Sequence, residues 1–98
     1  MSALSYTRLT PDEVQSALTT CPEWAVTDGL LTRSFTFGTY LEGVSFVAAV
    51  GWLAEGLNHQ PDLHLGYQQL RIELSTHDAG GLTSHDFEMA RRIDQLVN

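Results

Sequence analysis

Helix-start signals and the helical spacing of apolar residues predict three helices. Three segments begin with a threonine followed three residues later by an acid, namely Thr10–Glu13, Thr39–Glu42 and Thr83–Asp86. The threonine oxygen can accept from an N–H of the first turn, and the acid can reach back to the N–H of the cap residue. Pro11 suits the first helical position, where an N–H is not needed. We predict helices near 11–19, 40–58 and 84–97.

Alternation of apolar and polar residues along 24–37 predicts a first β-hairpin. Asp28-Gly29 is a strong signal for a two-residue type I′ turn, because both central residues of that turn need positive φ. The turn sets the pairs Val26 with Leu31 and Trp24 with Arg33. Arg33 interrupts the apolar face of the outgoing strand, and we interpret it as an edge position whose charged head reaches solvent.

A second hairpin is predicted over 62–76. A tight turn at Gln68-Gln69 would place Tyr67 opposite Leu70 and Leu65 opposite Ile72, with these four side chains on one face. Because side chains alternate along a strand, Arg71, Glu73, Ser75 and His77 then point to the other face. The pattern therefore predicts that His77 lies outside the core.

The order of the elements is a short N-terminal helix followed by β-β-α-β-β-α. This order predicts an α+β fold of two layers, a four-stranded antiparallel sheet covered by helices on one face. The helix at 40–58 is apolar over much of its circumference, although a helix that covers one sheet needs a single apolar stripe. The excess predicts a second buried face and hence self-association through this helix.

Composition limits the classes of function. The chain has 98 residues, which predicts a single domain over 1–98, and no apolar run is long enough to span a membrane. The net charge is −7 with only five basic residues, which argues against direct nucleic-acid binding. The first residues lack the pattern of a signal peptide, and the single cysteine, Cys21, agrees with a reducing compartment. We expect a cytoplasmic protein.

Two histidines are candidates for proton transfer, because imidazole titrates nearest neutral pH. His59 falls at the end of the long helix, and Glu55 one turn earlier would favour its charged form. The alternative for His59 is a C-capping residue with a routine ion pair. His77 is expected at a strand end, before Gly80-Gly81, which let the backbone approach a ligand but would also serve a plain bend.

Asp86 can orient a histidine, although a capping role at the start of the last helix would also explain it. His64 and His85 are expected to be exposed and are given no role. The histidines lack His-x-x-x-His spacing, so the sequence gives no support for a metal site and we predict none. Glycine-rich phosphate loops and Gly-x-Ser-x-Gly motifs are also missing. These observations leave proton-transfer chemistry on a small neutral molecule, or no catalysis.

One combination of motifs extends over almost the whole length of the chain: Leu31-x-Arg33-x-Phe35-x-Phe37, Glu55-x-x-x-His59-x-Pro61, Tyr67, Ser75-Thr76-His77, Gly80-Gly81-Leu82 and Asp86. In this combination the chain resembles the pterin-4a-carbinolamine dehydratases, also called 4a-hydroxytetrahydrobiopterin dehydratases. The resemblance implies a β-β-α-β-β-α fold that forms dimers or tetramers through the long helix. It also implies a lyase that removes water from a 4a-hydroxytetrahydropterin to give the quinonoid dihydropterin, without metal or organic cofactor, and so regenerates tetrahydrobiopterin-type cofactors.

By this resemblance His59 and His77 transfer protons and Asp86 orients a histidine. Substrate contacts are implied for Glu55, Gln60, Pro61, Ser75 and Thr76. The departure from the family pattern is Gln60, where the family usually has a second histidine. Glutamine can hydrogen-bond a pterin but cannot shuttle a proton. The chain is therefore expected to be an enzyme that uses His59 and His77, or else a non-catalytic relative that serves as a dimerisation or assembly factor.

Overall fold

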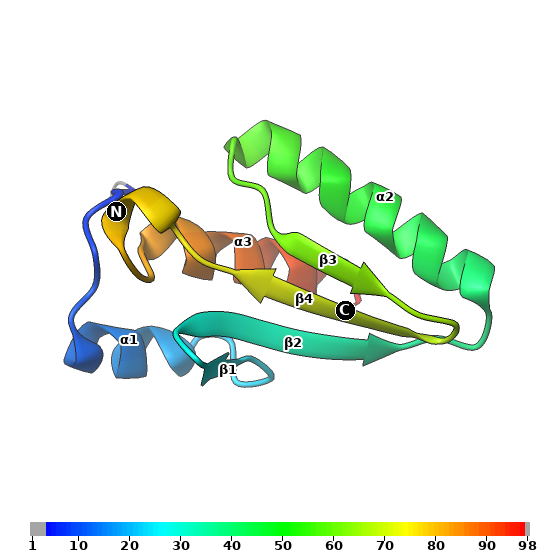
Figure 1. The fold of residues 1–98 in the computed structure, drawn as a ribbon, viewed down its shortest axis with the longest axis horizontal. Coiled ribbons are helices and arrows are strands. Elements are labelled where there is room, and N and C mark those ends of the chain that lie inside the picture. The colour runs from blue at the N-terminus through cyan, green and yellow to red at the C-terminus, as the bar shows by residue number, and fades with distance from the viewer. Residues whose placement is uncertain (1–3, 98) are drawn as a thin grey trace.

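The computed structural model describes residues 4–97, so the predicted domain, 1–98, extends past the described part at both ends. The helices are α1 (Pro11–Leu18), α2 (Tyr40–Leu57) and α3 (Ser84–Gln95), with a short 3-10 helix, η1 (His77–Ala79), before α3. The strands are β1 (Ala25–Thr27), β2 (Leu30–Thr36), β3 (Asp62–Leu65) and β4 (Gln69–Leu74). They form one antiparallel sheet in the order β1-β2-β4-β3 (Figure 1).

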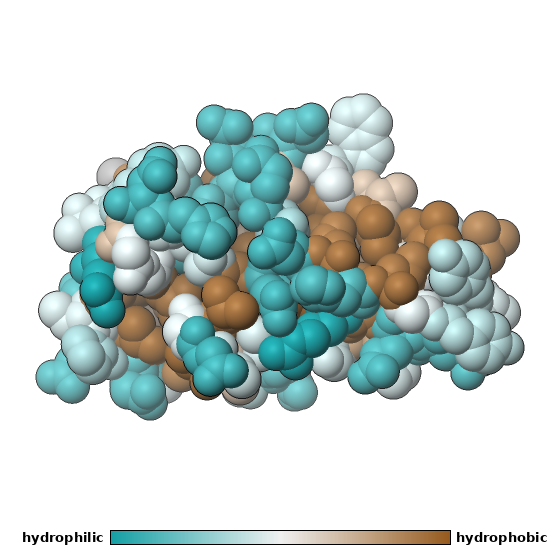
Figure 2. All heavy atoms as spheres, viewed as in Figure 1, coloured by the Kyte–Doolittle hydropathy of each residue, from teal (hydrophilic) through white to brown (hydrophobic). Residues whose placement is uncertain are grey.

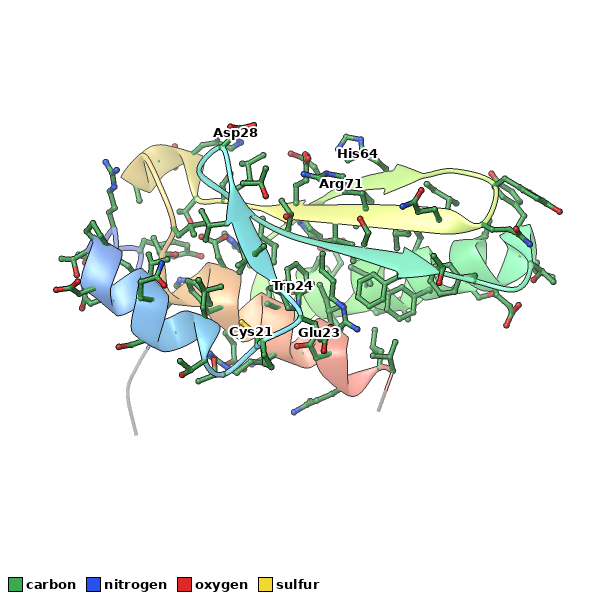
Figure 3. The ribbon with its side chains drawn as sticks, turned by 90° about the horizontal axis from the view of Figure 1, so that it is seen from below. Cys21, Glu23, Trp24, Asp28, His64 and Arg71 are labelled. Atoms are coloured by element: carbon green, nitrogen blue, oxygen red, sulfur yellow. The ribbon has the colours of Figure 1, made fainter. Side chains whose placement is uncertain are left out.

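All three helices cover one face of the sheet and leave the other face bare. Figure 3 shows the layers edge-on, with His64 and Arg71 pointing away from the helices on the bare face. The predicted α+β fold, with its N-terminal helix and its four-stranded sheet covered on one side, is therefore confirmed. Among the described residues, no helix has the length and apolarity needed to cross a membrane.

The core lies between the sheet and helices α2 and α3. Strand alternation points Leu31 and Phe35 of β2 and Leu70, Ile72 and Leu74 of β4 toward the helices, and all five are buried. They pack with buried residues of the helices, namely Val50, Ala54, Phe87, Met89, Ala90 and Ile93. Burying each large apolar side chain contributes about 1.5–3 kcal/mol, so this layer is the main source of stability.

The first hairpin has the predicted turn. Asp28 has φ 53° and Gly29 has φ 79°, as a type I′ turn requires, and Val26 pairs with Leu31. The predicted pairing of Trp24 with Arg33 is wrong, because the ladder ends at the pair of Ala25 and Thr32. Trp24 precedes β1, and its indole N–H donates to Asp94 Oδ1 of α3 at 2.7 Å.

The edge position predicted for Arg33 agrees with the pairing, because β1 pairs only with Leu30–Thr32 and, among the described residues, β4 is the one strand beside Arg33. The charged head, however, is only 18% exposed, and the guanidinium lies 4.3 Å from the centre of the Phe35 ring. Arg33 Nη1 donates to Asp94 Oδ1 at 2.6 Å. A charged side chain on the covered face is thus tolerated because α3 supplies a carboxylate for it.

The register of the second hairpin differs from the prediction. Leu65 pairs with Leu70 rather than with Ile72, so the turn is centred on Tyr67 and Gln68. The neighbouring strand fixes this turn, because the Phe37 N–H donates to the Gln68 carbonyl at 2.9 Å and Gln68 Nε2 donates to the Gly38 carbonyl at 2.9 Å. The pairing is displaced by an even number of residues, so the side chains of β3 and β4 keep their predicted faces. Tyr67 does not, because it lies in the turn and is 74% exposed.

Two of the three helix-start signals form complete capping boxes. In the boxes of α1 and α3, the threonine accepts from the first turn while the acid accepts from the cap N–H. At α2 only half of the box forms, because Glu42 accepts from the Thr39 hydroxyl instead of its N–H. The helix starts are therefore as predicted, and the helix ends lie within two residues of the prediction.

Candidate active site

His59 lies directly after α2, where the backbone reverses. The helix is capped by Asn58 in the left-handed conformation, φ 53°, and the Asn58 N–H donates to the carbonyls of Ala54 and Glu55. Asparagine adopts this conformation more readily than most residues, so Asn58, and not His59, ends the helix. The reversal turns the imidazole of His59 inward, where the residue is only 7% exposed.

Asp86 is the buried partner of His59. Its carboxylate is fully buried in the first turn of α3, and its Oδ1 lies 2.6 Å from His59 Nε2. Its Oδ2 accepts from the Thr76 hydroxyl and from the Thr83 N–H, each at 2.9 Å. The two sequence-based explanations of Asp86, capping a helix and holding a histidine, are therefore both present in one side chain.

This arrangement fixes the tautomer of His59. An ionised carboxylate only accepts hydrogen bonds, so Nε2 carries the proton that lies between the two residues. In the neutral ring Nδ1 is then the basic nitrogen. A proton taken up at Nδ1 would produce an imidazolium already paired with a buried carboxylate, so His59 can accept and return a proton without moving.

A pocket of about 550 Å³ adjoins His59, and its volume is within the range typical of small-molecule sites. Its wall includes His59, Gln60, Ser75, Thr76 and His77. Two other surface pockets, each of about 640 Å³, are larger, but neither is lined by a histidine. The chemistry of the lining, rather than its size, therefore marks this pocket as the candidate site.

His77 is exposed, as strand parity predicted, but it does not end a strand. Strand β4 ends at Leu74, and His77 is the first residue of η1, which closes at Gly80 with φ 71°. A bridge between Thr76 and Gly81 joins the two ends of this turn. The turn brings His77 to the same pocket as His59, although the predicted element was wrong.

Glu55 and Pro61 lie apart from this pocket. Both line a smaller one, of about 370 Å³, beside α2 and β3, and Gln60 lines both pockets. Glu55 is exposed, and the hydrogen-bond partner of His59 is Asp86. We expected Glu55 to favour the charged form of His59. The carboxylate beside His59 is instead that of Asp86, which is distant in sequence.

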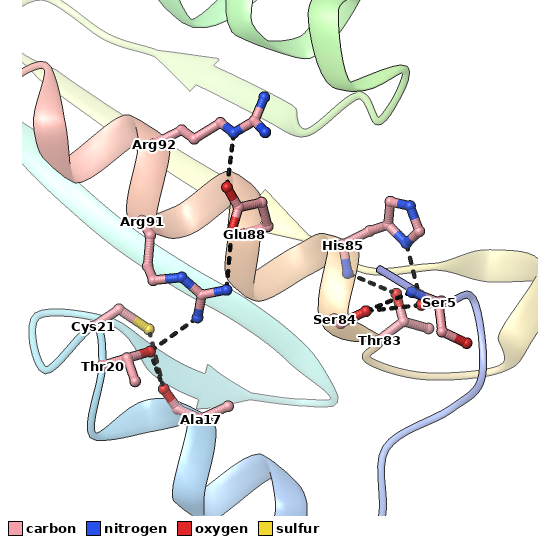
Figure 4. Close-up of polar contacts among 10 residues, drawn as sticks. All are labelled: Ser5, Ala17, Thr20, Cys21, Thr83, Ser84, His85, Glu88, Arg91 and Arg92. Carbon is pink, nitrogen blue, oxygen red and sulfur yellow. Dashed lines mark hydrogen bonds and ion pairs between the residues drawn. The ribbon is translucent and has the colours of Figure 1, made fainter. Parts of the chain in front are cut away.

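His85 was expected to be exposed, and this expectation is wrong. Its residue is 8% exposed, its ring centre lies 5.7 Å from that of His59, and Nδ1 donates to the Ser5 carbonyl at 3.1 Å (Figure 4). The covering residue is Tyr6, which also lines the pocket. No local sequence signal marks either residue, because the contact joins the two ends of the chain.

His64 is exposed, as expected, and pairs with Glu73 on the bare face of the sheet. Hydrogen bonds from Arg71 and then His64 hold the pKa of the Glu73 carboxyl below its ordinary value. Within residues 4–97, no three metal-ligating side chains gather in one place. The pocket lined by His59 and His77 therefore has two imidazoles in its wall, one of them hydrogen-bonded to the buried Asp86 carboxylate.

The fold and the pocket define a class: a small α+β protein with a buried histidine–aspartate pair at a pocket beside an open antiparallel sheet. The sequence matches the model of the family described as pterin 4 alpha carbinolamine dehydratase over residues 7–96. The chain belongs to this family.

Relatives agree with that membership. Proteins from Picosynechococcus sp. and Natronomonas pharaonis, both named "Putative pterin-4-alpha-carbinolamine dehydratase", are 42% and 43% identical over 90 residues. The alignments cover 92% of this chain in both cases, and 98% and 96% of the relatives. The chain and these relatives therefore correspond over nearly their whole lengths.

Two solved structures share the fold. The structure described as a transcriptional coactivator/pterin dehydratase from Brucella melitensis has TM-score 0.88 and 32% identity, covering 94% of this chain and all of that one. A pterin dehydratase-like protein, identified as a RuBisCO assembly factor in the alpha-carboxysome, has TM-score 0.60 and 24% identity, covering 74% of this chain and 84% of that one. The second likeness concerns the fold alone.

Proposed function

We propose that this protein is a hydro-lyase that converts a 4a-hydroxytetrahydropterin to the quinonoid dihydropterin and water. The observation that carries the proposal is the buried Asp86 carboxylate, 2.6 Å from His59 Nε2, at a pocket that His77 also lines. Family membership supplies the substrate class. The whole chain corresponds to relatives named for this activity, which supports the same reaction.

The reaction needs two proton transfers. The C4a–O bond breaks readily only when the hydroxyl leaves as water, so an acid must protonate it. The electron pair that forms the new C=N bond comes from a ring nitrogen, which loses its proton to a base. Two imidazoles at one pocket match this requirement, and the net products are the quinonoid dihydropterin and one water.

The proposed roles follow from the surroundings of each residue. His59 is held through Nε2 by Asp86, and within residues 4–97 no hydrogen-bond partner occupies Nδ1, where we expect it to take or give one proton. His77, which is exposed and lines the same pocket, exchanges the second proton. Gln60 and the hydroxyl of Ser75 offer hydrogen bonds to the polar edges of a pterin, whereas Thr76, whose hydroxyl already donates to Asp86, contributes to the wall of the pocket. Which histidine is the acid and which the base is left open by this geometry.

A direct assay tests the proposal. A 4a-hydroxytetrahydropterin generated in situ by an aromatic amino-acid hydroxylase should disappear faster when purified protein is added than in buffer alone. The rate should rise in proportion to protein concentration. Decay at the buffer rate over the whole concentration range would refute the enzymatic function.

A second candidate function is that of a dimerisation or assembly factor for another protein. The exposed apolar side chains of α2 favour it, since Leu41 is 70% and Trp52 is 80% exposed. Figure 2 shows apolar side chains gathered over the region where the first half of α2 lies. Gln60, in place of the family's usual histidine, points the same way. A stable hetero-complex from native lysate, combined with a rate equal to buffer, would favour this candidate over the enzyme.

Under either function we propose that a second copy of the chain covers the apolar side of α2, giving a dimer or tetramer. Exposed apolar area of this kind is unusual on a monomer. Light scattering at micromolar concentration should give a multiple of the monomer mass. Replacement of Trp52 by serine should shift the mass toward the monomer, and a monomeric mass for the wild-type protein would refute self-association.

A further inference from the structure

The segment Leu4–Leu9 is exposed but firmly attached beside the site. The Ser5 N–H donates to Ser84 Oγ at 2.8 Å, and the same hydroxyl donates back to the Ser5 carbonyl at 3.0 Å. The Leu9 N–H donates to the Leu82 carbonyl at 2.8 Å. Together with the bond from His85 Nδ1, these contacts fasten the segment to the start of α3 (Figure 4). The residue between these attachments, Tyr6, is therefore held in a defined place.

Tyr6 lies between a buried histidine and the pocket. Its ring is parallel to that of His85, with centres 3.7 Å apart and an interplanar angle of 6°, and it lies 6.4 Å from His59. Tyr6 itself is 52% exposed, and its side chain lines the same pocket as His59 and His77. One ring face is taken by His85, while the rest of the phenol remains available to a pocket ligand.

His85 is oriented by its own contacts. A carbonyl only accepts, so the bond to Ser5 places a proton on Nδ1, and burial restricts the ring further. The imidazole then presents a fixed flat face on which Tyr6 rests. Without a residue of this shape, an exposed tyrosine in a loop segment would sample several rotamers and lose its alignment with the pocket.

We propose that Tyr6 contacts the substrate and helps to select it, and that His85 positions Tyr6. The substrate class is that of the proposed function, on which this inference rests: the planar pyrimidine half of a pterin packs against the aromatic wall. Aromatic rings favour offset or edge contacts with a second flat ring, and the phenolic hydroxyl can bond to ring nitrogens or oxygens. Tyr6 thus contributes to ground-state recognition and takes no part in proton transfer.

The test measures binding and turnover separately. Titration calorimetry with 7,8-dihydropterin, which has no hydroxyl to lose, gives Kd for wild type, Tyr6→Ser and Tyr6→Phe. Tyr6→Ser should raise Kd and KM about 3- to 10-fold, the range expected for one aromatic contact, with kcat within about 2-fold. Tyr6→Phe should retain most of the affinity. The control Tyr67→Ser, at a 74% exposed tyrosine in the β3–β4 turn, should match wild type.

The outcomes separate the two claims. If wild type neither binds the dihydropterin nor accelerates dehydration, the proposed function fails and this inference with it. If wild type binds and Tyr6→Ser binds equally well, only the role of Tyr6 is overturned. A loss in Tyr6→Phe as large as in Tyr6→Ser would overturn the ring contact as its basis.

The positioning role of His85 is tested by a pair of variants that a purely structural role would not distinguish by their affinity for the ligand. His85→Ala should raise Kd and KM about as much as Tyr6→Ser, whereas His85→Phe keeps a flat face and should restore most of the affinity. Urea unfolding of both variants identifies conditions where each is folded. If His85→Phe is as weak a binder as His85→Ala under those conditions, positioning by the stacked ring is overturned.

Discussion

The two histidines of the pocket occupy opposite environments. His59 is buried, and its partner Asp86 has both carboxylate oxygens engaged. His77 is exposed, in a short turn that follows β4. The buried half of the candidate site, His59 and Asp86, is therefore part of the packed interior, whereas the exposed half, His77, lies on the protein surface. Changes in the first half should affect stability and chemistry together, and changes in the second half should affect chemistry alone.

The largest effect is expected for Asp86→Ala. This change leaves His59 Nε2–H, the Thr83 N–H and the Thr76 hydroxyl without their buried acceptor. The free energy of unfolding should fall by about 3 kcal/mol, and kcat should fall about 100- to 1000-fold. Urea unfolding and the dehydration assay measure the two quantities. The matched variant Asp86→Asn keeps the shape and should lose less stability, but its amide can donate to His59 and disturb the tautomer. Full activity in Asp86→Asn would contradict control of the tautomer by Asp86.

His77→Ala should separate chemistry from stability. The side chain is exposed, so the free energy of unfolding should change by less than about 0.5 kcal/mol, while kcat falls about 100-fold. His64→Ala is the control, since His64 is also exposed but lies on the bare face of the sheet (Figure 3). Equal rates for the two variants would remove His77 from the proposed mechanism.

Gln60→His also changes the exposed half of the candidate site, and we expect a smaller change in kcat than for His77→Ala. Gln60 is exposed and lines the pocket, so a histidine there should leave stability unchanged within about 0.5 kcal/mol. If His59 and His77 already carry the chemistry, kcat should rise no more than about 10-fold. A rise from the buffer rate to full turnover would instead show that the natural chain lacks a catalytic group at this position.

The smallest effect concerns the pH dependence of α3, the helix that carries Asp86. Hydrogen bonds from Arg92 and then Arg91 hold the pKa of the Glu88 carboxyl below its ordinary value (Figure 4). The folded-state pKa is lowered, so this stabilisation is present above about pH 4.5, the ordinary value of a glutamate, and is lost as pH falls through the folded pKa. Glu88→Gln should cost about 0.5 kcal/mol at pH 7 and nothing at strongly acidic pH, measured by urea unfolding. Glu23→Gln, at an exposed acid, serves as control, and an equal loss at both pH values would contradict the charge pairing.

The comparison also separates what local sequence could predict from what it could not. Strand parity correctly predicted the buried face of β4, because alternation along a strand depends only on backbone geometry. His77 is exposed as predicted, but it lies in η1, beyond the end of β4, so alternation is not the cause of its exposure. Burial of His85 was missed because Tyr6, from the far end of the chain, covers it. The hydrogen bond between His59 and Asp86 likewise joins the end of α2 to the start of α3. Sequence patterns named both residues without giving their distance.

The sequence by itself determined the helix starts, the type I′ turn at Asp28 and Gly29, and the faces of the strands. These features depend on hydrogen bonds and steric limits within a few residues of the chain. The tertiary structure alone decided the register at Tyr67 and Gln68, the carboxylate partner of Arg33 and the partner of His59. Each of these depends on a group supplied by a distant segment, namely Phe37, Asp94 and Asp86. Such contacts form only when the layers pack, because only the packed protein brings those groups within hydrogen-bond distance.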